Sequence, residues 1–116
     1  MTPVPADMLL FFMIRMDIPM IENMLDESEQ YAGMAYTDFI AFLEQGFARH
    51  QAWGDSSILA LQGKYGYPAK VGYSFMGNKS FEQLKLVFVA DEDKQVVDII
   101  RDDSFRFDDN NFVIKK

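Results

Sequence analysis

The pattern of apolar and polar positions changes from helical spacing to alternation near residue 57. In the first half of the chain, Phe39, Leu43 and Phe47 form the clearest helical stripe. His50 continues this stripe, so the pattern turns its side chain toward the interior at the end of the helix. From Ser57 onward, apolar and polar residues alternate in short runs, which is typical of strands.

Two further helices are predicted before this one. The run from Asp7 to Met16 is apolar almost all round, so a helix there must be buried by another part of the molecule. Asp17 can cap a second short helix. Pro19 fits the first turn of that helix and also favours a helix start here. Pro3 and Pro5 precede the first helix, and we expect this leader to be frayed.

Alternation predicts strands at 57–64, 70–76, 82–90 and 95–101, with further candidates at 104–108 and 112–115. Gly77, Asn78 and Lys79 favour a tight turn, and Asp91 to Lys94 joins the next two strands, so neighbouring strands should form antiparallel hairpins. Three helices followed by such a meander predict an α+β domain. In this domain the helices pack on one face of a curved antiparallel sheet of four to five strands.

Length and composition are those of one domain, spanning residues 1–116. The chain is 49% apolar and includes 11 Phe, more than we expect so small a domain to bury alone, so a dimer interface or an internal pocket would use the surplus. It has no Cys, which excludes disulfides and thiolate metal sites. The apolar run Met8–Ile14 is too short to span a bilayer and lacks the layout of a signal peptide, so we expect no membrane contact and a cytoplasmic location.

The charge balance excludes several classes of function. A net charge of −7 repels phosphate backbones, so nucleic acid is not an expected partner. The acidic stretch from Asp26 to Glu29 should be a solvated connection that ends at Gly33. No acidic cluster has the spacing of a calcium loop, and the chain contains neither a P-loop nor a dinucleotide-binding fingerprint, so no metal or cofactor is expected.

The order of the predicted elements resembles the cystatin-like superfamily, which includes the nuclear-transport-factor-2-like proteins. The stretches 84–89 and 96–101 resemble the final hairpin of that fold, and 72–79 also resembles small uncharacterised bacterial proteins. The resemblance implies a cone-shaped cavity between the helices and the concave sheet, and a homodimer formed through the outer face of the sheet. Members include isomerases, dehydratases, epoxide hydrolases and transport adaptors, so the fold leaves the function open.

His50 and Asp98 are the sharpest candidates for chemistry. By alternation Asp98 shares a strand face with Val96 and Ile100. A carboxylate on so apolar a face is costly to bury, which indicates a function for it. If that face lines a cavity, His50 and Asp98 could transfer a proton at carbon or activate water. Two alternatives stay open: His50 can be structural, complementing the dipole at the helix end, and Asp98 can lie on the outer face with Val97 and Ile99 turned inward.

Aromatic side chains are the candidates for ligand binding. Tyr65, Tyr67 and Tyr73 surround the bend and the second strand, and phenols near a cavity mouth could bind a carbonyl or an aromatic ligand. Phe47 and Trp53 complete this set. Tyrosine is also a common strand residue, and Trp53 can equally be a core anchor.

These observations leave three hypotheses about function. The leading one is a noncatalytic binding or interaction domain, homodimeric, with a small apolar pocket for a small organic ligand. The alternative is a small lyase, isomerase or hydrolase in which His50 is the general acid or base, Asp98 orients it, and Tyr65 or Tyr73 polarises an oxygen. The third is an adaptor whose aromatic sheet face and acidic helical face engage another protein.

Overall fold

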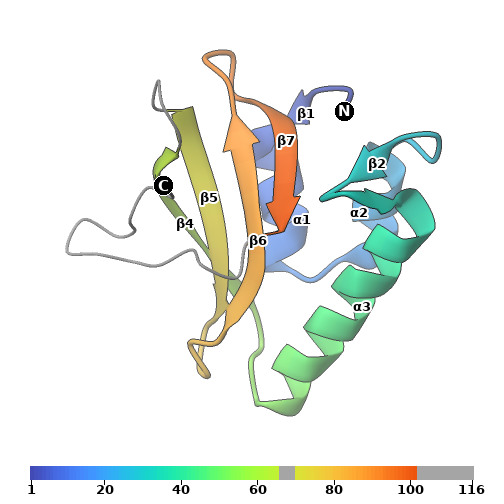
Figure 1. Cartoon of the computed structure of the whole chain (residues 1–116). Coiled ribbons are helices and arrows are strands. Elements are labelled where there is room, and N and C mark those ends of the chain that lie inside the picture. The colour runs from blue at the N-terminus through green and yellow to red at the C-terminus, as the bar shows by residue number, and fades with distance from the viewer. Residues whose placement is uncertain (66–69, 102–116) are drawn as a thin grey trace.

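The computed structural model describes residues 1–65 and 70–101 and has the α+β architecture expected from the sequence (Figure 1). Three helices accompany a five-stranded antiparallel sheet, and a separate two-stranded sheet precedes the third helix. The strand candidates at 104–108 and 112–115 lie outside the described residues.

The helices are α1 (Ala6–Ile14), α2 (Ile18–Met24) and α3 (Tyr36–Ala52). The carboxylate of Asp17 accepts a hydrogen bond from the backbone N–H of Met20 at 3.3 Å, so the predicted cap of α2 is confirmed. The stripe predicted for α3 is buried along its whole length, and its members are Phe39, Ile40, Leu43, Phe47 and His50.

The large sheet is a meander of β4 (Ile58–Tyr65), β5 (Lys70–Gly77), β6 (Gln83–Ala90) and β7 (Gln95–Arg101). Its strand order is β1-β7-β6-β5-β4, with antiparallel pairing throughout. The predicted hairpins are therefore confirmed.

The sequence analysis predicted a frayed N-terminal leader, and this prediction is wrong. The leader forms β1 (Val4–Pro5) at one edge of the sheet. Val4 pairs with Val96, and the N–H of Ala6 donates to the carbonyl of Lys94 at 3.0 Å. Pro5 is tolerated because β1 is an edge strand, where its missing N–H breaks no ladder.

The predicted connection before α3 contains a hairpin that the sequence analysis missed, formed by β2 (Gln30–Tyr31) and β3 (Met34–Ala35). Its two turn residues, Ala32 and Gly33, have φ of +54° and +74°, as a tight two-residue hairpin requires. The N–H of Ala32 donates to the carbonyl of Ile99 at 3.1 Å, which fastens this hairpin to β7.

One core joins the three helices to one face of the sheet. Its largest fully buried side chains include Phe39, Leu43, Phe75 and Phe88. α1 lies behind the sheet and packs against β4, whereas α3 runs beside the sheet and ends near the β5–β6 turn (Figure 1). Within residues 1–65 and 70–101, no helix combines the length and hydropathy needed to cross a membrane.

Candidate functional site

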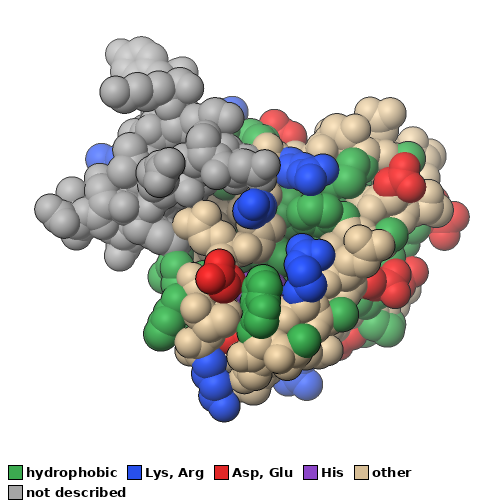
Figure 2. Space-filling model, turned by 60° about the horizontal axis from the view of Figure 1, so that its bottom comes forward, with side chains coloured by type: hydrophobic (Ala, Val, Ile, Leu, Met, Phe, Trp, Pro, Cys, Tyr) green, Lys and Arg blue, Asp and Glu red, His purple; other side chains and the backbone are tan. Residues whose placement is uncertain are grey.

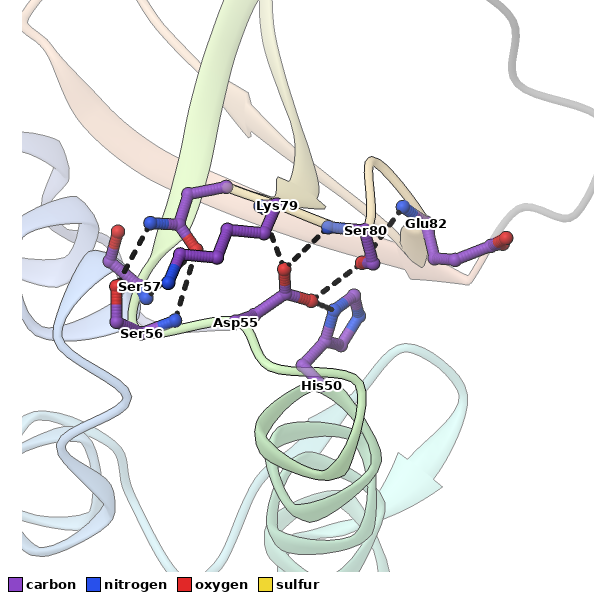
Figure 3. A network of polar contacts seen from close by, with 8 residues as sticks. His50, Asp55, Ser56, Ser57, Lys79, Ser80 and Glu82 are labelled. Carbon is purple, nitrogen blue, oxygen red and sulfur yellow. Dashed lines mark hydrogen bonds and ion pairs between the residues drawn. The ribbon is translucent and has the colours of Figure 1, made fainter.

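A buried His50–Asp55 pair lies where α3 ends (Figure 3). Nδ1 of His50 is 2.8 Å from Oδ2 of Asp55, and only 1% of His50 is exposed. Trp53 and Gly54 reverse the chain between them, and the φ of +92° at Gly54 is one that glycine adopts without strain. The N–H of Asp55 then donates to the carbonyl of His50 at 2.9 Å, which closes the loop.

The Asp55 carboxylate is also held by the turn between β5 and β6. Oδ1 accepts hydrogen bonds from the backbone N–H groups of Lys79 at 2.8 Å and Ser80 at 2.7 Å. Oδ2 accepts from Ser80 Oγ at 2.6 Å in addition to its contact with His50. Both oxygens therefore have two partners, which connect the end of α3 to the hairpin turn.

This network keeps Asp55 ionised. Burial alone would raise the pKa of the Asp55 carboxyl, but the hydrogen bonds from Ser80, His50 and Lys79 outweigh it and hold the pKa well below its ordinary value. A carboxylate that receives several N–H and O–H donors behaves in this way because the donors stabilise only the charged form.

Gly77 makes room for the network. A Cβ built on Gly77 would overlap the Asp55 carboxylate and lie 2.5 Å from Ser80 Oγ. Any larger residue would therefore push the carboxylate away from its donors.

Asn78 forms a second connection between the same two segments. Its Oδ1 accepts from the N–H groups of Ser56 at 3.0 Å and Ser57 at 3.3 Å, and its Nδ2 donates to Ser56 Oγ at 3.0 Å. The N–H of Asn78 donates to the carbonyl of Ser57 at 3.1 Å. The start of β4 is thus fixed against the β5–β6 turn.

Two exposed aromatic rings flank this scaffold. The Trp53 ring lies 5.2 Å from the His50 ring at 82°, an edge-to-face contact, and 50% of Trp53 is exposed. Trp53 is therefore not a core anchor. Phe81 directly follows Ser80, is 64% exposed and has a φ of +57°, which is unusual for a bulky residue.

Sequence reasoning identified His50 and Trp53 but missed Asp55, Ser80 and Phe81. A usable signal was present, because Asp55 follows the Trp53-Gly54 helix end, where a short acidic side chain can bind neighbouring backbone N–H groups. Nothing in the pattern identified the β5–β6 turn as its partner.

Asp98 is exposed, and the structure does not bring it to His50. In β7, Asp98 pairs with Val89 and Val96 pairs with Ala90, so Val97 is an extra residue in a β-bulge. The bulge resets the alternation on which the sequence argument depended. Val96 and Ile99 are therefore the buried residues, and Asp98 is turned away from the core.

The remaining predicted binding residues do not form one site. Phe47 is buried in the main core, and Tyr73 packs against that core, where burial and the nearby Asp7 charge raise the pKa of its phenol. Tyr65 instead packs against Val87 on the opposite face of the sheet. Tyr65 and Tyr73 therefore cannot act on one ligand from the same side.

A pocket of about 540 Å³ lies elsewhere, between the N-terminal segment and the turn after α2, and is open to solvent. Its walls include Leu25, Asp26, Glu29 and Tyr31. The Tyr31 hydroxyl accepts from the N–H of Asp26 at 2.7 Å, and Glu29 accepts from the N–H of Thr2. The lining is thus partly polar, in contrast to the small apolar pocket of the leading hypothesis. Across the described ranges, no three carboxylate or imidazole side chains gather as a metal site.

Comparison of the chain with protein-family models, with curated proteins and with solved structures finds no match. The geometry of the site therefore carries the functional argument.

Proposed function

We propose that this chain is a noncatalytic interaction domain of the nuclear-transport-factor-2-like type, which recognises another protein through Trp53 and Phe81. The observation that carries the proposal is Phe81, a large apolar side chain that is mostly exposed and held at a positive φ. The fold type is supported by the element order and by the helices packed on one face of an antiparallel meander.

The left-handed backbone conformation of Phe81 costs free energy, and packing of its side chain does not offset this cost in the free chain. A left-handed conformation costs a residue other than glycine roughly 1–2 kcal/mol. Burial of the ring would offset this cost, but the ring is exposed in the free chain. Such strain is concentrated at functional sites, and exposed aromatic rings are enriched in protein interfaces. A partner that covers the ring would supply the missing burial.

The His50–Asp55 network explains how the two rings are presented. Trp53 lies between the paired residues in the chain and contacts the His50 ring, while Phe81 follows the Ser80 that binds Asp55. A surface that is already ordered loses less conformational entropy when it binds. We therefore assign His50 and Asp55 a positioning role beneath a recognition surface.

The surrounding charges indicate the chemistry of the partner. Arg49 and Lys79 are exposed beside the network, and so is Glu82 next to Phe81, in a chain whose net charge is −7. At this end of the molecule, Lys and Arg side chains lie among hydrophobic ones, and most Asp and Glu side chains lie along one margin (Figure 2). A partner with an apolar pocket and a few acidic groups at its rim fits this surface.

The proposal is tested by site-specific photocrosslinking. A photoreactive amino acid placed at position 81 should give an adduct with one partner protein, whereas the same group at Met20, another exposed apolar residue, should not. Phe81→Ala should then weaken binding of that isolated partner at least about tenfold, with Met20→Ala unchanged. Equal adducts at both positions, or unchanged binding in Phe81→Ala, would rule out this surface.

The 2.8 Å His50–Asp55 contact favours one second candidate, a small lyase, isomerase or hydrolase in which Asp55 rather than Asp98 orients His50 as a general base. A general base must be accessible to its substrate. His50 is the only histidine in the chain, so its reaction with diethyl pyrocarbonate can be followed in the untagged protein. Slow modification in the native state supports the positioning role, and modification as fast as in the unfolded chain supports an accessible base.

A further inference from the structure

Strand β4 is one edge of the five-stranded sheet. It pairs with β5 in an uninterrupted register, from Ile58 opposite Gly77 to Lys64 opposite Val71. Among the residues that the structure describes, no other strand pairs with Ile58 to Lys64. An edge of this kind presents a row of backbone donors and acceptors that another strand can bind.

The two edges of the sheet differ. At the opposite edge, β7 is covered by β1 and by the hydrogen bond from Ala32 to Ile99. Monomeric proteins protect long edges with proline, bulges or several charges. Between Ile58 and Lys64, β4 has no proline or bulge, and Lys64 is its only charged residue.

Exposed apolar side chains occur on β4 and on the helix that packs against it. Leu59 on β4 is exposed, and α1, which packs against β4, exposes about half of both Met8 and Phe11. By contrast, Val87 on the outer face of the central strands is only 1% exposed within one chain. Leu59 thus leaves apolar surface uncovered on the edge strand itself, whereas the apolar centre of the outer face is already buried.

We infer that β4 is the interface for a second copy of this chain, paired antiparallel about a two-fold axis perpendicular to the sheet at Leu61. Such an axis keeps each face of the sheet continuous, so only residues on the same face pair. Leu61 then faces its own copy, Leu59 faces Gly63, and Ile58 faces Lys64. The two Lys64 ammonium groups are not opposed, so the register carries no charge repulsion.

The absence of cysteine makes this register directly testable. In Leu61→Cys, the two cysteines lie directly opposite, at the roughly 5 Å Cα separation of antiparallel partners, and mild oxidation should link the subunits rapidly. In Leu59→Cys, they are offset by about 13 Å along the strands and should not link. Equal linking at both positions, or none at 61, overturns the inferred register.

Sedimentation equilibrium of the native chain tests the dimer itself. We expect a mass of twice 13.4 kDa at micromolar concentration. Leu61→Lys, which opposes two charges, should weaken the dimer at least about 100-fold, whereas Met20→Lys, which adds the same charge on α2, should not. The inference is contradicted by a monomer at all concentrations, or by a dimer that Leu61→Lys leaves intact. A monomer whose β4 binds a different protein would instead assign the edge to that partner.

Discussion

Asp55 is a buried carboxylate whose charge is stabilised by its donors, and this makes stability depend on pH. Because the pKa of Asp55 is lower in the folded state than in the unfolded state, its contribution is fully present above about pH 4. The contribution is lost as the pH falls toward the lower folded value. Asp55→Asn has no such charge, so its difference in unfolding free energy from the native protein should shrink as the pH falls below about 4.

Urea denaturation of both proteins at several pH values measures this difference. The comparison removes the effects of the other carboxylates, which the two proteins share. A difference that stays constant from pH 7 to pH 2.5 would mean that the network does not lower the pKa of Asp55.

Phe81 separates backbone strain from side-chain packing. Phe81→Gly should be more stable than Phe81→Ala by about 1 kcal/mol, because glycine adopts a φ of +57° without the Cβ contact that alanine retains. Loss of the ring itself should matter little in the free chain, since Phe81 is 64% exposed. Thermal and urea unfolding of the two variants check this order, and a more stable Ala variant would show that the turn relaxes from the left-handed conformation.

The candidate residues show what periodicity can and cannot predict. His50 was placed inside because a helix has a fixed period, and nothing in α3 interrupts it. Asp98 was placed by the period of a strand, which one extra residue at Val97 resets. The turn that holds Asp55, the partner of His50, could not be predicted, since Lys79 and Ser80 lie more than twenty residues further along the chain.

At the scale of elements, the link between α3 and the β5–β6 turn depends on Gly77. Gly77→Ala should destabilise the protein by about 2–3 kcal/mol, because the new methyl group displaces the Asp55 carboxylate or the turn. Gly33→Ala is the matched control. Gly33 has a positive φ but no atoms near its would-be Cβ, so its substitution should cost only about 1 kcal/mol of backbone strain.

Urea denaturation at pH 7 compares these two variants. Equal losses would indicate that the turn accommodates the methyl group by moving. In that case Asp55 would keep its donors, and the network would be less rigid than the recognition surface requires.

Long elements were predicted well and short ones were not. The helix α3 and the strands β4 to β7 each repeat a pattern over seven or more residues, so their existence followed from sequence. The strands β1, β2 and β3 each have two residues, too few for any period. They form because tertiary contacts with β7, or with each other across a tight turn, supply partners that the local sequence does not reveal.

At the scale of the whole molecule, the two ends of the sheet should unfold together. Val4 in β1 is buried in the core, and β1 lies at the opposite end of the molecule from the turn after α3 (Figure 1). That turn contains Trp53, the only tryptophan in the sequence. Far-UV circular dichroism reports all elements, whereas Trp53 fluorescence reports one end. If the described residues form one cooperative unit, as their continuous core suggests, both signals will change at the same urea concentration.

Val4→Ala tests this cooperativity from the far end. Loss of two buried methyl groups should lower the free energy of unfolding by about 1–2 kcal/mol. Because the perturbation enters at β1 and is read at Trp53, the fluorescence midpoint must move as far as the circular dichroism midpoint if the unit is single. A shift confined to circular dichroism would mean that β1 and its neighbours unfold before the recognition end, which would then behave as an independent unit.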